Sequence, residues 1–185
     1  LVARTLYNRG LTSPHDALAF LDPDRYTPSP PSALPGITQS AAQIITAVHE
    51  KQRILIWGDF DVDGQTSTAL LVSSLKALGA TVDHHIPIRS VESHGVSVPV
   101  LSEIIQSRSP QLLITCDTGI DAVEAVNFAN QSGVEVIITD HHRVSDPLPS
   151  AVAVVNPKRS DCTAGDLDRR DLKLRDMTEA SKPNL

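Results

Sequence analysis

Short apolar runs alternate with segments of helical periodicity through the middle of this 185-residue chain, and this alternation limits the fold more than any other feature. Strands separated by helices of about 10 to 15 residues form βαβ units with parallel strands. We therefore predict an α/β fold with a mostly parallel sheet of about five strands flanked by helices. Strands are expected at 53–58, 81–87, 111–116, 135–139 and 151–155, and helices at 38–51, 65–78, 99–107 and 120–131.

The two ends of the chain depart from this pattern. Ser13 followed by Pro14 is typical of a helix start, so a short helix is expected through Leu21. Five prolines in residues 23–35 predict an extended connector. The other end is highly charged and is expected to be poorly ordered. Three parts are predicted: a helical preface with its proline-rich connector at 1–36, an α/β subdomain at 37–160, and a charged tail at 161–185.

Composition limits the partners and the cellular compartment. The net charge of −6 argues against a surface that is basic all over, so any nucleic acid would have to be bound by a local patch. Cys116 and Cys162 show no metal-type spacing, which fits a reducing, cytoplasmic environment. No apolar run reaches the roughly 18 residues that a membrane span needs, so no membrane association is expected.

Acidic side chains follow three of the predicted strands, and two histidines accompany the last acid. They are Asp59, Asp61 and Asp63 after 53–58, Asp117 after 111–116, and Asp140 with His141 and His142 after 135–139. Ligands of open parallel sheets bind outside the carboxyl ends of the strands, and there we expect these side chains to meet. Clustered carboxylates repel one another and are costly to bury without a partner. The pattern therefore predicts a divalent-metal site suited to phosphate-ester chemistry.

The same acids allow other interpretations. A calcium-binding EF-hand loop needs a glutamate at its twelfth position, where this chain has Leu70, so that interpretation fails. A haloacid-dehalogenase-type phosphatase also begins with Asp-x-Asp, but Asp63 replaces the usual threonine and no later Asp-Asp pair occurs. Asp117 taken alone is equally compatible with a helix N-cap, and the remaining histidines with ordinary surface or core positions.

Three motifs carry a resemblance to a known family. They are Asp59-Phe60-Asp61-Val62-Asp63-Gly64, Asp117-Thr118-Gly119-Ile120 and Asp140-His141-His142. In this order and at these separations they resemble the DHH phosphoesterase superfamily and, within it, the RecJ-type single-stranded-DNA-specific exonucleases. The resemblance runs from residue 1 to about residue 161 and includes the proline-bearing preface.

The resemblance implies a role for each residue of the predicted site. Asp59, Asp61, Asp117 and His141 are expected to bind a pair of Mn²⁺ or Mg²⁺ ions. His142 is expected to face the scissile phosphate as a catalytic residue, and Asp63 to act with it. Asp140 is expected to orient the ligands from behind. Mixed carboxylate and imidazole ligands suit Mn²⁺.

The family's Asn-Arg…Gly-Tyr-Gly motif is only partly present. Arg89 and His94 are the expected substrate-binding residues, with Arg89 as a phosphate contact. This chain has Ile88 and His94 where asparagine and tyrosine are commoner. Trp57 stands where some relatives carry a histidine ligand, so that ligand is expected to be missing or replaced by water.

The activity implied is metal-dependent phosphodiester hydrolysis, as a 5′-to-3′ exonuclease on single-stranded DNA in recombination and repair. A single-strand-binding protein or a helicase would be a partner. Hydrolysis of oligoribonucleotides, cyclic dinucleotides or pyrophosphate by another family member stays open, as does a non-catalytic scaffold. Members of the RecJ type continue with a further aspartate ligand, a substrate-gripping domain and an OB-type domain. We therefore expect this stretch alone to bind metal weakly and to degrade DNA poorly or not at all.

Overall fold

The computed structural model describes residues 1–92, 94–144 and 146–159, which form two compact units that divide after Ala33. The charged tail predicted at 161–185 lies outside the described residues. In the first unit, Ser13 caps a helix as predicted, because its hydroxyl accepts a hydrogen bond from the Asp16 N–H at 3.0 Å. The unit comprises α1 (Val2–Asn8), α2 (Pro14–Leu21) and the short 3₁₀ helices η1 (Pro23–Arg25) and η2 (Pro31–Ala33).

The second unit contains the predicted α/β fold. Its five strands are all parallel and lie in the order β2-β1-β3-β4-β5. The strands are β1 (Arg53–Gly58), β2 (Thr81–His85), β3 (Leu112–Cys116), β4 (Glu135–Thr139) and β5 (Ala153–Val155). The helices are α3 (Ile37–His49), α4 (Val62–Ala77), α5 (Arg89–Glu92), α6 (Val98–Arg108) and α7 (Val123–Gln131).

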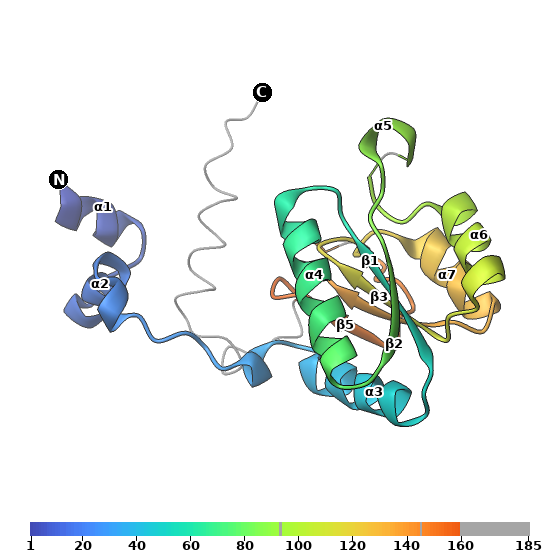
Figure 1. The fold of residues 1–185 in the computed structure, drawn as a ribbon. Helices are drawn as coiled ribbons and strands as arrows, with labels where there is room; N and C mark the ends of the chain where they lie inside the picture. The colour runs from blue at the N-terminus through green and yellow to red at the C-terminus, as the bar shows by residue number, and fades with distance from the viewer. Residues whose placement is uncertain (93, 145, 160–185) are drawn as a thin grey trace. The chain divides into compact units, whose positions relative to one another are not determined.

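Helices cover both faces of the sheet, as Figure 1 shows, with α3 and α4 on one face and α6 and α7 on the other. Ile54 and Ile56 point to the first face and pack with Ala47 of α3 and Leu75 of α4. Side chains between them, among which is Leu55, point to the second face. Each fully buried aliphatic side chain contributes about 1.5 to 3 kcal/mol. The core is largely aliphatic, with Trp57 among its fully buried side chains. No helix in the described part of the chain has the length and apolarity to cross a bilayer.

Several element boundaries differ from prediction by a few residues, and two of them have clear local reasons. Helix α4 begins at Val62, not at Gln65, because the Asp61 side chain accepts a hydrogen bond from the Gly64 N–H at 3.0 Å and caps the helix there. Asp63 therefore lies in the first turn of the helix and not in a loop. Strand β2 ends at His85, two residues before Pro87, whose nitrogen has no hydrogen to donate to a ladder.

Candidate metal centre

Sheet register brings the strand-end acids to one edge. Gly58 of β1 pairs with Cys116 of β3, and Cys116 pairs with Thr139 of β4, so these three residues lie in one row across the sheet. The next residue in each strand is an acid. The row that follows is therefore Asp59, Asp117 and Asp140.

Asp117 is the most buried of the predicted metal ligands. The residue is only 8% exposed, and its backbone has a left-handed φ of 61°, a conformation that aspartate tolerates better than most residues. The turn continues through Gly119 at a φ of 103°, where a Cβ atom would stand 2.7 Å from the Thr115 hydroxyl, so only glycine fits. The turn thus fixes the Asp117 carboxylate at the end of β3.

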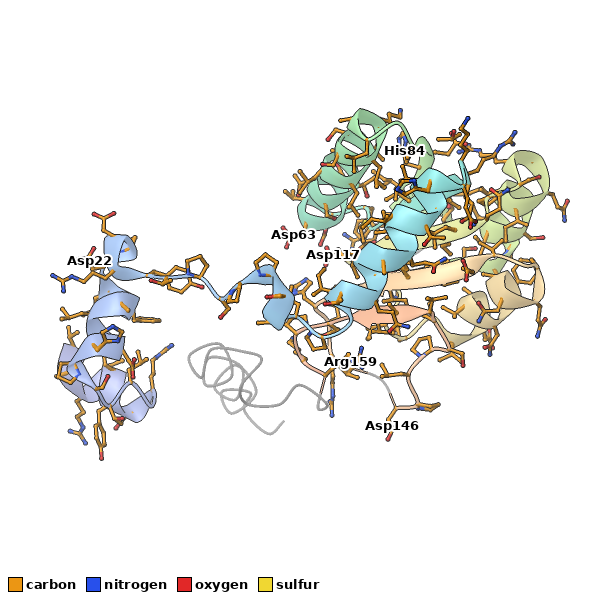
Figure 2. All side chains as sticks on the ribbon, turned by 90° about the horizontal axis from the view of Figure 1, so that it is seen from below. Asp22, Asp63, His84, Asp117, Asp146 and Arg159 are labelled. Carbon is orange, nitrogen blue, oxygen red and sulfur yellow. The ribbon has the colours of Figure 1, made fainter. Side chains whose placement is uncertain are left out.

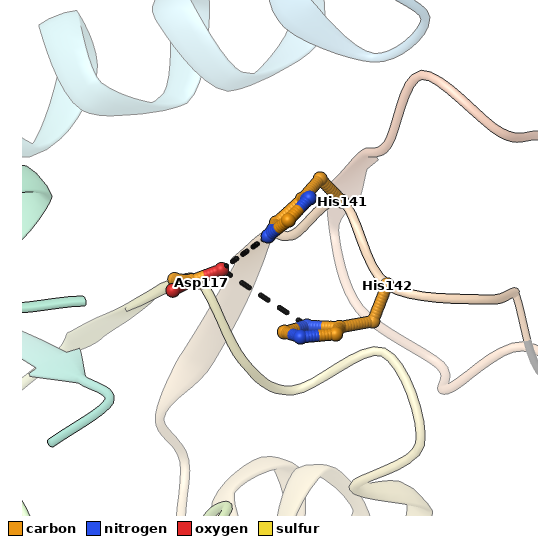
Figure 3. Close-up of side chains that lie close together, drawn as sticks. All are labelled: Asp117, His141 and His142. Carbon is orange, nitrogen blue, oxygen red and sulfur yellow. Dashed lines mark ion pairs between the residues drawn. The ribbon is translucent and has the colours of Figure 1, made fainter. Parts of the chain in front are cut away.

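The two histidines stand directly against this carboxylate (Figure 3). His141 Nε2 lies 2.8 Å from Asp117 Oδ1, and His142 Nδ1 lies 4.0 Å from the same oxygen. One candidate ligand atom from each of the three side chains falls within 4.8 Å of the other two. A six-coordinate ion with ligands at about 2.1 Å sets adjacent ligand atoms about 3 Å apart and opposite ones about 4.2 Å apart. A spread of up to 4.8 Å is slightly wider than such a ligand shell, so the three side chains are close together but are not set as the ligands of one ion.

Asp140 has a different environment. Its Oδ1 accepts hydrogen bonds from the backbone N–H and the Nδ1 of His142, at 2.9 and 2.7 Å, and its Oδ2 accepts one from the Ile120 N–H at 3.0 Å. Both oxygens are thus used within the protein. His142 is left with Nε2 for any bound group. This contact pattern fits the predicted orienting role, which stays a prediction.

The segment 59–64 brings further carboxylates to the same place. Gly64 allows the first turn of α4 to approach Asp59, since a Cβ on Gly64 would stand 2.5 Å from the Asp59 backbone. Asp63 and Asp117 lie close together in Figure 2 and border one hollow with His141. Its lining is completed by Leu34, Ser67, Thr139, Asp140, Val155 and Pro157.

Proton affinities show how Asp61 and Asp117 interact. Burial raises the pKa of Asp117, which the two histidines partly offset and the charge of Asp61 reinforces. The pKa of Asp61 is lowered, chiefly by the hydrogen bond from the Gly64 N–H. A cation bound beside these two carboxylates would relieve their repulsion.

The pKa of His142 is raised above its usual value. Burial alone would lower this pKa, but the hydrogen bond to Asp140 and the charges of Asp140 and Asp117 outweigh it. Lys158 acts in the opposite direction. The imidazolium form of His142, a hydrogen-bond donor, is therefore favoured.

The predicted substrate-binding residues lie at different places. Arg89 is exposed on α5, with its guanidinium carbon 4.9 Å from the centre of the Phe60 ring, so it stands beside the Asp59–Asp61 segment. His94 is also exposed but borders a separate hollow with Pro99 and other residues at the starts of α6 and α7. A substrate contact by either residue stays a prediction.

Sequence reasoning missed Asn156. This side chain is fully buried; its amide donates to the His142 carbonyl at 3.0 Å, and its oxygen accepts from the Lys158 N–H at 2.8 Å. Asn156 directly follows β5, the same position that the acids occupy after β1, β3 and β4. A search for amide as well as acidic side chains directly after each predicted strand would have found Asn156.

The residues present fit a divalent cation. Within the described residues, both oxygens of Asp117 and Oδ1 of Asp59 are buried and accept no hydrogen bond. Buried carboxylate oxygens without donors are costly, and a bound cation removes that cost. Carboxylate and imidazole together suit Mn²⁺ among the common divalent ions.

Comparison with known proteins places the chain in a family. Residues 53–166 match the DHH family, N-terminal domain. The chain is 39% identical over 166 residues to the single-stranded-DNA-specific exonuclease RecJ of Bacillus subtilis (strain 168), covering 88% of this chain and 21% of that protein. It is 42% identical over 133 residues to RecJ of Haemophilus influenzae, covering 71% and 23%.

Solved structures agree. A crystal structure of exonuclease RecJ bound to manganese matches with a TM-score of 0.63 and 34% identity, over 81% of this chain and 39% of that one. RecJ from Thermus thermophilus in complex with Mn²⁺ matches with a TM-score of 0.61 and 32% identity, over 86% and 24%. The chain thus spans less than a quarter of the length of the two curated relatives named above. The family match covers more than half of the chain and all the strand-end acids, and we conclude that this chain belongs to the DHH family.

Proposed function

We propose that this chain forms the metal-binding part of a phosphodiesterase that degrades single-stranded DNA. The observation that carries the proposal is the buried Asp117 carboxylate, whose oxygens accept no hydrogen bond from the described residues and which faces His141, His142 and Asp61. A scaffold module does not need a buried carboxylate at this place, because burying the charge costs stability even with His141 beside it. The names of the relatives, single-stranded-DNA-specific exonucleases, support the choice of substrate.

The proposed ligands are Asp59, Asp61, Asp117 and His141, holding two Mn²⁺ or Mg²⁺ ions. Manganese in the related crystal structures supports the choice of metal. Such ions, when bound, polarise phosphoryl oxygens and lower the pKa of a bound water toward neutrality. Asp63, at the first turn of α4, would orient the ligands from the other side of the hollow.

His142 would act on the phosphate itself. Asp140 holds its Nδ1 at 2.7 Å and fixes the ring, so Nε2 is the atom available to the substrate. The raised pKa of His142 favours the protonated ring, which can donate to a phosphate oxygen or to the leaving oxygen. Arg89 would neutralise phosphate charge by a forked contact.

Three finer statements belong to the same proposal. The polarity of degradation is 5′ to 3′, the process served is recombination and repair, and the protein partners are a single-strand-binding protein or a helicase. A cytoplasmic location follows from the unpaired, buried Cys116 as a prediction only. Because the chain spans only 21 to 23% of the two curated relatives, all of these concern a whole protein of that type.

A nuclease assay tests the proposal. Single strands labelled at the 5′ or the 3′ end are incubated with the chain and Mn²⁺, beside the same chain extended to the length of its relatives. We expect Mn²⁺-dependent release from the 5′ end, weak or absent for this chain and strong for the longer one, and lost in Asp61→Asn. Oligoribonucleotide, cyclic dinucleotide and pyrophosphate serve as competing substrates. Preferential hydrolysis of one of these by the longer chain would contradict the choice of DNA, and unchanged turnover in Asp61→Asn would contradict the metal site.

A further inference from the structure

The segment Ile86–Glu92, here called the arm, leaves the end of β2 and carries α5 and Arg89. Figure 1 shows α5 away from the sheet and from the helices that cover it. The arm's exposed apolar side chains do not hold it, since Ile88 is 60% and Val91 is 79% exposed. Something other than apolar packing of these residues must set its position.

One carboxylate ties the arm to its own base. Glu92 Oε2 lies 2.7 Å from His85 Nε2, and Glu92 Oε1 accepts a hydrogen bond from the Ile88 N–H at 3.2 Å. The His85 and Glu92 side chains are only 18% and 12% exposed. A short contact shielded from water is stronger than the exposed ion pairs of a protein surface.

Trp57 fixes the other side of His85. Its ring centre lies 4.4 Å from that of His85, and its Nε1 donates to the Gly95 carbonyl at 3.2 Å. Trp57 is fully buried at the end of β1, so it is a rigid support. His85 therefore sits between an immobile ring and the Glu92 carboxylate.

Arg89 gains a defined place from this support. Its guanidinium lies over Phe60, the residue between the predicted ligands Asp59 and Asp61. An exposed cation–π contact is weak and cannot hold a flexible side chain and its backbone by itself. The stronger restraint is the Glu92–His85 contact, three residues further along the same short helix.

We infer that His85 and Glu92 are positioning residues, which hold the arm so that Arg89 stands at the edge of the metal centre to bind a substrate phosphate. This inference rests on the proposed function, because it takes the ligand of Arg89 to be a phosphate of single-stranded DNA. Neither His85 nor Glu92 touches the substrate. Both act through Arg89.

A double-mutant cycle tests the inference. The probe is a 3′-fluorescein-labelled phosphorothioate dT12, whose binding is followed by anisotropy in Mn²⁺. Glu92→Ala is expected to weaken binding about fivefold to tenfold, and Glu92→Gln, which keeps acceptor and shape, to recover most of it. In the Arg89→Ala background, Glu92→Ala is expected to have no further effect. Glu103→Ala, an exposed glutamate of α6, is the matched control and should leave binding unchanged.

Trp57 supplies a readout that does not depend on DNA. It is the single tryptophan of the chain, so its emission reports the His85 side of the arm directly. The emission is expected to change in Glu92→Ala and to stay unchanged in Arg89→Ala and Glu103→Ala. Circular dichroism of each variant excludes global unfolding.

The outcomes separate this inference from the proposed function. Additive losses in the cycle, or unchanged dT12 binding in Glu92→Ala, would overturn the inference, as would an unaltered chain that does not bind dT12. Mn²⁺ binding is measured separately by calorimetry and should be equal in Glu92→Ala and the unaltered chain. If the unaltered chain did not bind Mn²⁺, the metal centre alone would be contradicted. The contact between His85 and Glu92 could still be tested, because the Trp57 emission can be recorded in EDTA.

Discussion

Two pairs of consecutive histidines lie at the ends of strands of the same sheet, and their surroundings differ. His84 and His85 are the last two residues of strand β2. The His85 side chain is 18% exposed and contacts the Glu92 carboxylate and the Trp57 ring. His141 and His142 follow strand β4 and face Asp117, whose buried oxygens accept no hydrogen bond from the described residues. The first pair completes a structural contact, whereas the second contacts the buried carboxylate of Asp117. The acids that face a histidine pair therefore decide whether the pair is a candidate metal site.

The largest expected effect comes from removing the acid that faces the second pair. Asp117→Asn should weaken Mn²⁺ binding by more than about 100-fold, because an amide cannot replace a buried carboxylate ligand. The same change should raise stability in EDTA. The raised pKa of Asp117 means that its contribution to stability is present below the ordinary pKa of aspartate and is lost as the pH rises through its own pKa. At neutral pH the carboxylate is therefore a cost, which asparagine removes.

Calorimetry with Mn²⁺ and thermal unfolding in EDTA measure the two halves of this prediction. His84→Ala, an exposed change in the first pair, should leave the Mn²⁺ affinity within about twofold. Equal loss in His84→Ala and Asp117→Asn would remove the distinction between the two pairs.

Substitutions of Asp61 are expected to have a smaller effect and can distinguish its role as a metal ligand from its role as a helix cap. This side chain caps α4 through the Gly64 N–H, and asparagine caps helices as well as aspartate does. We expect Asp61→Asn and Asp61→Ala both to lose Mn²⁺ affinity by at least about tenfold, but only the alanine variant to unfold at a lower temperature. Calorimetry and thermal melts of the two variants measure this. If asparagine kept full affinity, Asp61 would be a cap and nothing more.

The smallest expected effect concerns Cys116, which precedes Asp117 in the sequence. It measures how strongly burial at the end of β3 shifts the pKa of a side chain that is not a predicted metal ligand. Burial raises the pKa of the Cys116 thiol to about 11 from 9.0. Stability should therefore be intact below pH 9 and fall as the pH rises toward 11, by about 1 to 3 kcal/mol. In a Cys162→Ser variant, a thiol reagent at pH 8 should modify Cys116 only on unfolding. Rapid modification of the folded variant would show that the end of β3 is open to solvent.

Sequence was sufficient for the sheet and for the acids that follow its strands. Apolar runs of strand length separated by helices leave few topologies, and parallel register then brings Asp59, Asp117 and Asp140 into one row. These are consequences of backbone geometry. They do not depend on the details of side-chain packing.

The finer arrangement depended on contacts that spacing does not encode. Because the Gly64 N–H donates a hydrogen bond to the Asp61 side chain, α4 begins earlier than predicted and includes Asp63. Arg89 lies over the ring of Phe60, and the His142 carbonyl accepts a hydrogen bond from the buried amide of Asn156. Each of these contacts joins residues whose pairing is decided by the folded backbone.

The most direct test of a metal centre at His141 and His142 is a Mn²⁺ titration followed by nuclear magnetic resonance of the histidine side chains. Mn²⁺ is paramagnetic and broadens the signals of the nuclei closest to it. Our account predicts that the imidazole signals of His141 and His142 broaden at a smaller fraction of Mn²⁺ than those of His84 and His85. Broadening that begins at His84 and His85, or that affects all four rings at the same Mn²⁺ fraction, would contradict it.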